Sequence, residues 1–331
     1  MKILVTGGTG FLGRALTKKL RKANYDVNVV SRRAPVKKNT IDGVAYHQCD
    51  LSRETLSRKV MKDVSVVFHA AAKAGVGGRY SDYYAANFIA TKNILRASES
   101  SSVSAFIYTS SPSVVFSGKP VQNGDESLPY AQNKISPYSH TKALAEKMVL
   151  ESNHSDTFQT LALRPHLFWG KGDPHLLPKV ISRHREKKLR IVGDGNNLVD
   201  LTHIENVVHA HLLAMERLLL HQNLGGNPYF IGQDEPISLW GWLNELFPKL
   251  DLPPLKKCVS FRKAYSIGKI TEIAWKVLGL RREIPMTRFV ACQLAQDHWF
   301  SNEAAKRDLG YYPVISMEDA LEKTIPWLRT L

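Results

Sequence analysis

Tyr138 and Lys142 are spaced so that they could form an acid–base pair. Ser136 and Pro137, just before them, favour the N-cap and the first turn of a helix. Residues four apart share one face of a helix, so the phenol and the ammonium are expected to point the same way. A lysine charge ~4 Å from a phenol contributes about 4 kcal/mol at an effective dielectric near ~20, enough to bring the phenol pKa from ~10 toward neutrality. The pair predicts proton transfer at a substrate oxygen without a metal.

The same four-residue spacing recurs in two other places, so spacing alone does not identify the catalytic pair. Tyr130 and Lys134 lie in a polar stretch between prolines and are not expected to share a helix. Tyr265 and Lys269 fall in the later part of the chain. Tyr138 alone follows a strand that carries hydroxyl side chains, so we predict that it is the catalytic tyrosine.

Hydroxyl side chains follow one apolar strand as the sequence Thr109-Ser110-Ser111-Pro112-Ser113. Hydroxyls at the carboxyl end of a parallel strand face the crevice where doubly wound proteins bind ligands. One of them could polarise a substrate carbonyl, and we predict Ser111, with Ser110 as the alternative. Together with the acid–base pair, this set predicts interconversion of a ketone and a secondary alcohol, which needs a hydride donor as well as a proton donor.

A glycine-rich loop lies between an apolar strand and a helical segment at the start of the chain. Glycine allows a sharp turn and lets backbone amides approach a pyrophosphate at the positive end of the helix. Such a loop is strong evidence for a dinucleotide site only in this strand–turn–helix context. The expected cofactor contacts in the loop are Gly7, Thr9, Gly10, Phe11, Leu12 and Gly13.

The end of the second strand indicates which dinucleotide is bound. NAD sites carry an acidic residue there that accepts from the ribose 2′-hydroxyl, whereas this chain has Ser31, Arg32 and Arg33. Guanidinium groups suit a 2′-phosphate, so we predict NADP(H). The segments after the next two strands supply the further expected contacts, which are Asp50, Leu51, Ala70 and Ala71.

Short apolar runs alternate with helical patterns over the first half of the chain. The patterns indicate strands at 2–6, 26–30, 65–69, 105–109 and 160–163 and helices at 12–23, 54–61, 83–98 and 137–151. This alternation predicts an α/β fold with a doubly wound parallel sheet of the Rossmann type. Further on, the segments 206–220 and 240–246 are expected to be helical. We predict an NADP-binding domain over 1–165 and a smaller C-terminal substrate-binding lobe over 166–331, with some of its segments returning to the sheet.

The composition suits a cytoplasmic globular protein. Of the 331 residues, 44% are hydrophobic, and the three scattered cysteines argue against a disulfide framework or a zinc site. His209 and His211 stand two apart, off a common helix face, and are not expected to bind a metal. The net charge of +15 comes without a nucleic-acid-binding motif. No signal peptide and no apolar stretch of membrane-spanning length is found.

One later segment, 261–280, mixes aromatic, apolar and basic residues. Peripheral contact with a membrane is one interpretation of that mixture. A core helix with a solvated face is the favoured interpretation, because surface helices of globular proteins commonly show it.

Together these motifs resemble the extended short-chain dehydrogenase/reductase superfamily over nearly the whole chain. Within it, the chain resembles the 3β-hydroxysteroid dehydrogenase branch and, more narrowly, the 2-alkyl-3-oxoalkanoate reductases of bacterial long-chain olefin biosynthesis. The narrower resemblance rests on the segments 71–75, 163–170, 172–178, 192–200, 285–289 and 296–299. It implies NADPH-dependent reduction of a β-keto acid that carries two long alkyl chains.

The resemblance also implies site residues and partners. The remaining cofactor contacts that it implies are Lys73, Asn87, Thr109, Tyr138, Lys142, Pro165 and Leu167. The implied substrate contacts are Lys73, Ser111, His166, Phe168 and Trp169, with Lys73 as a candidate partner for the carboxylate. The implied partners are a lipid-like small molecule, a second copy in a homodimer and other enzymes of the same pathway, and no nucleic acid.

Three alternatives stay open at this point. A 3β-hydroxysteroid dehydrogenase and a nucleotide-sugar epimerase or dehydratase belong to the same superfamily, although the sugar enzymes usually need NAD. A non-catalytic NADP(H) sensor or scaffold would have no need for Tyr138 and Lys142 together.

Overall fold

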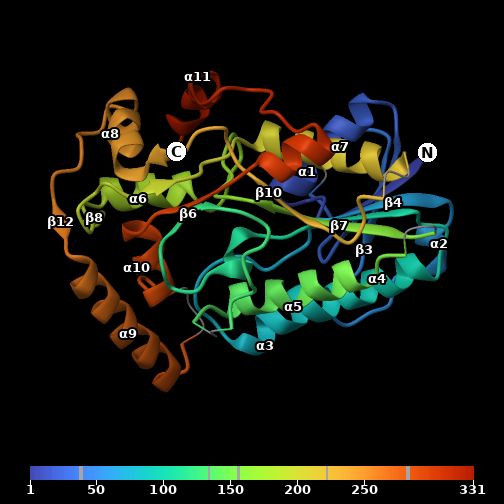
Figure 1. Cartoon of the computed structure of the whole chain (residues 1–331), viewed down its shortest axis with the longest axis horizontal. Helices are drawn as coiled ribbons and strands as arrows, with labels where there is room; N and C mark the ends of the chain where they lie inside the picture. Colours follow the sequence, from blue (N-terminus) through green and yellow to red (C-terminus); the bar gives the residue numbers. More distant parts are fainter. Residues whose placement is uncertain (37–39, 133–134, 155–156, 221–222, 281–283) are drawn as a thin grey trace.

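The protein is built around a seven-stranded parallel sheet, which confirms the predicted α/β doubly wound architecture (Figure 1). The computed structural model describes residues 1–36, 40–132, 135–154, 157–220, 223–280 and 284–331. The strand order is β10-β7-β5-β4-β1-β2-β3, and every neighbouring pair is parallel. The strands are β1 (Lys2–Thr6), β2 (Asp26–Ser31), β3 (Val44–Gln48), β4 (Val64–His69), β5 (Ala105–Thr109), β7 (Gln159–Pro165) and β10 (Pro228–Ile231). The order runs outward from β1 in both directions, so the ligand crevice is expected between β1 and β4.

Helices cover both faces of this sheet. Successive strand residues point to opposite faces, and Ile3 and Val5 of β1 belong to one core cluster while Leu4 belongs to the other. A strand covered on both faces must be apolar throughout, which is why β1 reads as a continuous apolar run. The first cluster includes α1 (Phe11–Lys22) and α7 (Ile204–Leu219), and the second includes α4 (Ala90–Glu99) and α5 (Pro137–Glu151).

Two helices differ from the sequence prediction. The helix expected over 54–61 is only α2 (Arg58–Met61), which begins where the Ser57 side chain accepts a hydrogen bond from the amide of Lys59. The helix expected over 83–98 is divided into α3 (Tyr80–Tyr83), a π-helical turn η2 (Tyr84–Ile89) and α4. A π turn adds a residue to the helix and is frequent at functional sites. This one carries Asn87, whose side chain holds the backbone that follows β4, as described below.

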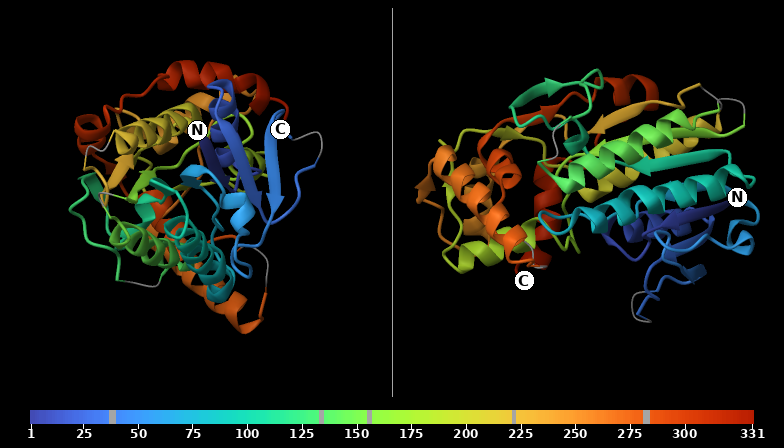
Figure 2. Two further views of the ribbon diagram at one scale, coloured as in Figure 1. Left: turned by 90° about the vertical axis from the view of Figure 1, so that its right-hand side faces the viewer. Right: turned by 90° about the horizontal axis from the view of Figure 1, so that it is seen from below.

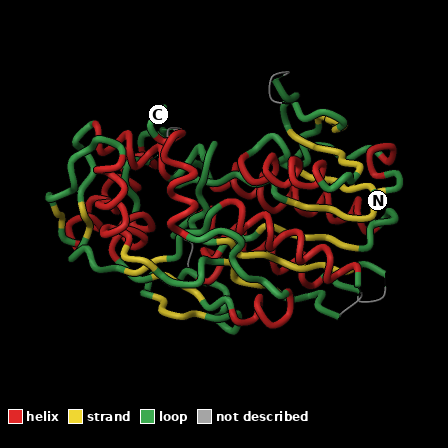
Figure 3. The backbone as a smooth tube through the Cα atoms, turned by 90° about the horizontal axis from the view of Figure 1, so that it is seen from above, coloured by secondary structure: helices red, strands yellow, loops and turns green. Residues whose placement is uncertain are grey.

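A smaller lobe lies beyond one end of the sheet (Figure 2). Its mixed sheet has the order β11-β9-β13-β6, with the strands β11 (Ile237–Ser238), β9 (Leu198–Val199), β13 (His298–Phe300) and β6 (Val121–Gly124). A two-stranded sheet joins β8 (Ile191–Val192) and β12 (Cys258–Val259). The helices of the lobe are α6 (Leu177–Arg185), α8 (Leu239–Lys249), α9 (Phe261–Val277), α10 (Arg288–Ala295) and α11 (Met317–Leu328). Figure 3 shows the contrast between this mainly helical end and the stranded end.

The chain crosses between the two parts in both directions. Although α7 and β10 come from the second half of the sequence, they pack on and extend the large sheet. Conversely, β6 comes from the first half and pairs with β13 in the lobe. These crossing segments connect the lobe to the large sheet. The space between the lobe and the sheet is therefore bounded by segments that are distant in sequence.

The helix α9 projects from the edge of the lobe (Figure 1). It is not the core helix that the sequence favoured, because only Ala264 and Gly268 are buried. Its exposed side carries apolar residues, among them Ile270 at 66% and Val277 at 78% exposure. None of the helices in the described part of the chain is long and apolar enough to cross a membrane.

Candidate active site

The glycine loop between β1 and α1 is pressed against the end of β4. Gly7 has a φ of 69°, and a Cβ added to it would lie 2.9 Å from the backbone of Ala71. A Cβ at Gly13 would lie 2.3 Å from the carbonyl oxygen of Gly7. Only glycine fits both positions, and Gly10, the N-cap of α1, makes no side-chain capping bond. The first amides of α1 are thus available to an anion.

A cavity of about 330 Å³ opens beside this loop, at the carboxyl ends of β1, β2 and β4. Ten residues predicted to bind the cofactor line it: Gly7, Thr9, Gly10, Ser31, Arg32, Arg33, Asp50, Leu51, Ala70 and Ala71. Asp50 is the one carboxylate in the described lining. Its Oδ1 accepts hydrogen bonds from the amide and hydroxyl of Ser52, at 3.1 and 2.6 Å, and the Ser52 bonds lower the pKa of the carboxyl. At the end of β2, where a ribose-binding carboxylate would lie, the chain presents Arg32 and Arg33.

A chain of buried hydrogen bonds, which the sequence analysis did not predict, joins the end of β1 to the segment after β4. His69 Nε2 lies 2.8 Å from the Thr91 hydroxyl, which donates to the carbonyl of Asn87, so the imidazole must donate to Thr91. His69 Nδ1 then accepts from the Thr6 hydroxyl at 2.6 Å, and Thr6 accepts from the amide of Ala71. Burial lowers the pKa of His69 to about 3, so the relay holds at neutral pH with an uncharged ring.

Three other residues predicted to contact the cofactor, Leu12, Asn87 and Thr109, do not line this cavity. The side chain of Leu12 is in the core, which leaves its backbone amide as the group that could face a ligand. Asn87 is buried and bonds the amide and carbonyl of Lys73 at 2.7 and 3.2 Å, so it shapes the segment after β4. The Thr109 hydroxyl donates to His211 Nε2 at 2.8 Å, on the opposite side of the sheet from α5.

The His211 ring is buried and bonded through both of its nitrogens. Its Nδ1 lies 2.7 Å from the carbonyl of Val207, so it donates there, and its Nε2 accepts from Thr109. Burial lowers the pKa of His211 to about 4. Within the described ranges, no group of three or more His, Cys, Asp or Glu side chains is placed to hold a metal ion.

The predicted catalytic side chains come together where α5 begins. The N-cap of α5 is Ser136, whose Oγ accepts from the amide of Ser139 at 3.2 Å, and Pro137 occupies the first turn, as predicted. The Ser111 side chain accepts from the amide of Ser113 at 3.2 Å and lies close enough to Tyr138 to favour its ionised form. This contact favours Ser111 over Ser110 as the partner of the tyrosine.

Lys142 lies one turn further along α5 and is fully enclosed. Its Nζ donates to the carbonyl of Thr109 at 2.5 Å and stands 4.0 Å from the centre of the Tyr108 ring. Both contacts favour the charged ammonium, and α5 is further held to β7 by a buried ion pair between Glu146 and Arg164.

The electrostatics of the pair differ from the sequence prediction. Burial raises the pKa of Tyr138, opposed by its bond to Ser111, so the lowered phenol pKa that we expected from Lys142 is wrong for this state. Burial also lowers the pKa of Lys142 to about 7, opposed by Glu146. Desolvation disfavours the charged form of both groups, and it is the largest cause of each shift. At neutral pH, Tyr138 is a protonated phenol that can donate.

The other two tyrosine–lysine pairs have different surroundings. Tyr130 donates to Glu146 at 2.9 Å and supports the ion pair of α5, and Lys134 lies outside the described residues. Tyr265 and Lys269 both belong to α9, in the outer part of the lobe.

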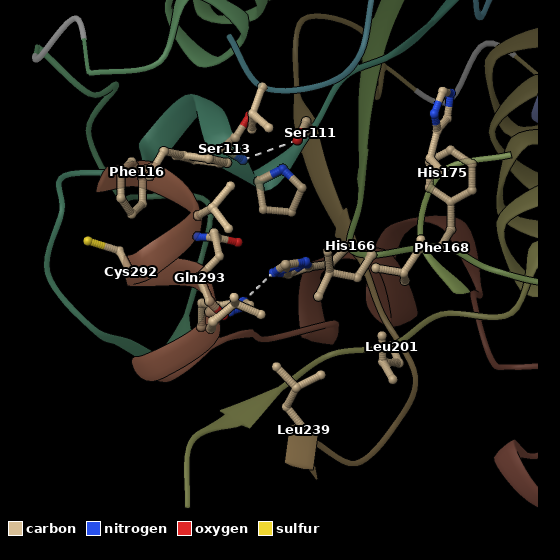
Figure 4. A pocket seen from close by; sticks show the side chains of 18 of the residues that line it. Ser111, Ser113, Phe116, His166, Phe168, His175, Leu201, Leu239, Cys292 and Gln293 are labelled. Atoms are coloured by element: carbon tan, nitrogen blue, oxygen red, sulfur yellow. Dashed lines mark hydrogen bonds between the residues drawn. The ribbon is translucent and has the colours of Figure 1, made fainter. Parts of the chain in front are cut away.

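A second cavity, of about 430 Å³, extends from Tyr138 and Ser111 into the lobe. Most of its lining is apolar and comes from both halves of the chain, including residues of α6, α8 and α10. Figure 4 shows part of this lining, with Leu239 of α8 and Gln293 of α10 labelled. Four predicted contacts also line it, namely Pro165, His166, Leu167 and Phe168. Phe11, from the glycine loop, stacks on Phe168 with ring centres 5.8 Å apart and contributes to the same wall.

Two predicted substrate residues are corrected by the structure. Trp169 is fully buried, 5.4 Å from the Trp242 ring, and lines neither cavity, because the chain turns inward there to pair with His203. The ammonium of Lys73 is 4.0 Å from a carboxylate oxygen of Asp82 and also lies outside both linings. The residues that sequence reasoning missed are the lobe residues of the lining, such as Trp240, Phe289, Gln293 and His298. Two of them fall in motifs that supported the family resemblance, which was the available signal.

Comparisons with known proteins agree with this geometry. The model of the 3-beta hydroxysteroid dehydrogenase/isomerase family matches residues 4–263. The 2-alkyl-3-oxoalkanoate reductase of Stenotrophomonas maltophilia is 41% identical over 325 residues, which cover 98% of each protein. The decarboxylating sterol-4-alpha-carboxylate 3-dehydrogenase of Mus musculus is 35% identical over 98% of this chain and 90% of its own. A solved UDP-glucuronic acid 4-epimerase from Bacillus cereus, in complex with NAD, shares the fold with a TM-score of 0.77, at 24% identity over 100% of this chain and 99% of its own.

Proposed function

Because the chain belongs to the 3-beta hydroxysteroid dehydrogenase/isomerase family of extended short-chain dehydrogenase/reductases, and is an oxidoreductase, we propose that it reduces a 2-alkyl-3-oxoalkanoate to the 2-alkyl-3-hydroxyalkanoate with NADPH. The observation that carries the proposal is the large apolar cavity that begins at Tyr138 and Ser111. The 41% identity with a reductase of that name supports the substrate class. We place the reaction in long-chain olefin biosynthesis on the same ground.

The small cavity fits a dinucleotide phosphate. Gly7 and Gly13 allow the tight turn that brings the start of α1 beside the cavity, since a Cβ at either residue would collide with backbone. Arg32 and Arg33 offer guanidinium groups for a 2′-phosphate at the end of β2. These residues would hold NADPH, which supplies a hydride to the substrate carbon.

Side chains of the protein supply the proton to the substrate oxygen. Ser111 donates a hydrogen bond to the substrate carbonyl, and Tyr138 transfers its proton to that oxygen as the alcohol forms. The positive charge of Lys142, one turn further along α5, would stabilise the tyrosinate left behind. The contacts of Lys142 with Thr109 and Tyr108 fix the position of its ammonium. Apolar walls keep water from the reacting carbon and bury the alkyl chains, each CH₂ contributing about 0.8 kcal/mol.

A substrate series tests the proposal. We expect kcat/KM for racemic 2-alkyl-3-hydroxy acids, followed through NADPH formation, to rise with alkyl length until the cavity is full. A 3β-hydroxysteroid and a UDP-sugar are tested in parallel as alternative substrates, since an enzyme for either class is not expected to depend on alkyl length. If kcat/KM does not change with alkyl length and the steroid is turned over, the protein would instead be assigned as a 3β-hydroxysteroid dehydrogenase. NADP binding without turnover of any alcohol would indicate a non-catalytic sensor.

A further inference from the structure

Two buried histidines line the large cavity close to the catalytic residues. His166 follows β7 and His298 opens β13, and their rings stack with centres 4.9 Å apart. His166 Nε2 lies 2.8 Å from His298 Nδ1, a bond dashed in Figure 4. The segments are 132 residues apart in sequence, so the pair exists only in the folded chain.

The hydrogen bonds determine which ring nitrogens carry protons. His298 Nε2 lies 2.7 Å from the carbonyl of Gln293, and a carbonyl can only accept, so Nε2 carries the hydrogen. His298 Nδ1 therefore carries no hydrogen and accepts a hydrogen bond from His166 Nε2. In the neutral pair, His166 Nδ1 is left as an acceptor on a residue that lines the cavity. An unmatched acceptor in an apolar wall is costly unless a ligand supplies a hydrogen bond or a proton.

We propose that His166, held by His298, is the subsite that binds the substrate carboxylate and takes up one proton from solvent as the carboxylate arrives. This inference rests on the proposed function, whose substrate carries a carboxylate on the carbon beside the reacting one. The proton is shared between His166 Nδ1 and a carboxylate oxygen, so no net charge is added to the buried site. The name of the 35% identical mouse relative also describes a carboxylate at the position next to a reacting 3-carbon.

The charges around the pair agree with proton uptake upon binding. Burial lowers the pKa of both rings, that of His298 to about 4, so each is neutral in the free protein at neutral pH. The titratable groups that act on the pair are each other's rings and Asp297, beside His298, whose carboxylate is bonded to the Leu198 amide at 2.7 Å. Tyr138 and Asp173 line the same cavity, and Asp173 is engaged with the amides at the start of α6.

Calorimetry on the NADPH-bound protein tests the proposal, because a reduced cofactor with a reduced ligand cannot react. The probe is a 2-alkyl-3-hydroxy acid, titrated near pH ~8 in buffers of different ionisation enthalpy. We expect uptake of about one proton per bound acid in the wild type and about none in His166→Gln. A carboxylate held by a permanent cation of the lining, such as Arg183, would bind without proton uptake in the wild type, which would overturn the proposal.

Kinetics separate a carboxylate subsite from a merely structural role. His166→Gln should lower kcat/KM for the hydroxy acid roughly 10- to 150-fold and leave the matching alcohol without a carboxylate nearly unchanged. His209→Gln, on α7 and outside both cavities, is the matched control and should alter neither. Equal losses on acid and alcohol would assign His166 a structural role. Absence of wild-type turnover on any 2-alkyl acid would contradict the proposed function instead, and the calorimetry would still decide the subsite.

A different observation concerns the outer face of α9. Gly268 brings α9 against the segment before α10, since a Cβ there would lie 2.6 Å from the backbone of Arg288. The opposite face presents Ile267, Ile270 and Ile273 at 41–66% exposure, with Val277 and Leu278 further along. The side chains of Arg262, Lys269 and Lys276 flank this stripe on one side, by helical spacing. The α10 wall that α9 covers also lines the large cavity.

We infer that this α9 face docks on an anionic lipid surface, from which a poorly soluble substrate could enter the cavity. The basic flank complements anionic headgroups, and the net charge of +15 acts in the same direction. A second copy is disfavoured as the occupant in an antiparallel twofold pairing of the two α9 helices, because that pairing would bring the two basic flanks together.

Vesicle sedimentation tests the inference. Wild-type protein should sediment with vesicles of phosphatidylserine and phosphatidylcholine, more at low salt, and not with phosphatidylcholine alone. A variant with Ile270→Ser and Ile273→Ser should lose sedimentation while keeping turnover of a short, soluble substrate. If the wild type fails to bind anionic vesicles, or the variant only changes the oligomeric state, the inference is wrong.

Discussion

The two cavities of this protein are built in different ways. The small cavity is lined by residues from the first 90 positions, and its shape depends on backbone: glycines without room for a Cβ and strand ends that present their amides. The large cavity is lined by side chains from Phe11 to Phe300, mostly apolar, contributed by both halves of the chain. A cavity shaped by backbone requires particular residues, such as glycine, at a few positions. A cavity shaped by side chains can bind a different ligand when those side chains are substituted. The cofactor is therefore expected to be the invariant feature and the substrate the adjustable one.

The largest expected effect lies where the chemistry occurs. Tyr138→Phe should lower turnover about 10²- to 10⁴-fold, because the phenol is the proton donor at the substrate oxygen. NADPH affinity, measured by fluorescence titration, should hardly change, since Tyr138 belongs to the lining of the large cavity. Tyr265→Phe, on α9, is the control and should remain active, as should Tyr130→Phe. An inactive Tyr265→Phe variant would show that the wrong tyrosine was chosen.

Arg32→Ala should act on the small cavity alone. Loss of a charge-assisted contact with the 2′-phosphate costs roughly 1.5–3 kcal/mol, or about a 10- to 150-fold rise in the KM for NADPH. The KM for NADH and the dependence of kcat/KM on alkyl length should stay as they are. Steady-state kinetics with both cofactors gives the comparison, and Arg33→Ala is the parallel variant. Tighter binding of NADH than NADPH by the wild type would contradict the assignment of NADP(H).

Acid should destabilise the fold through two buried histidines, His69 beside the small cavity and His211 behind β5. The pKa values of His69 and His211 are lowered to about 3 and about 4, whereas both rings would titrate near 6.5 when unfolded. The unfolded chain takes up these protons first, so stability is complete above pH ~6.5 and is lost as the pH falls toward ~4. Each ring contributes about 2 kcal/mol between pH ~6.5 and ~5. Urea unfolding across this range should show the loss, and His211→Gln should reduce its slope; an unchanged slope would contradict the assignment.

The smallest effect is expected at the wall of the large cavity. Phe289, on α10, is half-buried, lines the cavity and packs edge-to-face on Phe116 with centres 4.9 Å apart. Phe289→Ala should lower kcat/KM roughly 3- to 10-fold for the longest alkyl substrates, which reach this wall, and little for short ones. NADPH affinity should not change. An equal loss at every chain length would indicate a general loss of structure rather than of alkyl contacts.

Much of the cofactor site could be read from the sequence because its determinants are local. A strand, a turn of glycines and a helix follow one another between Lys2 and Lys22, and the N-cap of α5 lies next to Tyr138. Ten of the predicted contacts line the small cavity for that reason. Lys73 and Trp169, which were predicted to contact the substrate, line neither cavity. Their placement depends on the direction of a side chain in a loop, and that direction depends on what the loop packs against.

The α/β class, the loop at Gly7 and the helix that carries Tyr138 could be predicted from the sequence, since periodicity, capping and glycine spacing act over a few residues. The proximity of Ser111 to Tyr138, the bond between His166 and His298 across 132 residues and the exposure of the α9 isoleucines required the folded chain. The tertiary structure also reversed the expected pKa of Tyr138, because desolvation depends on how completely the surrounding elements enclose the phenol. Contacts between distant segments and the degree of burial are properties of the folded chain, and no local pattern contains them.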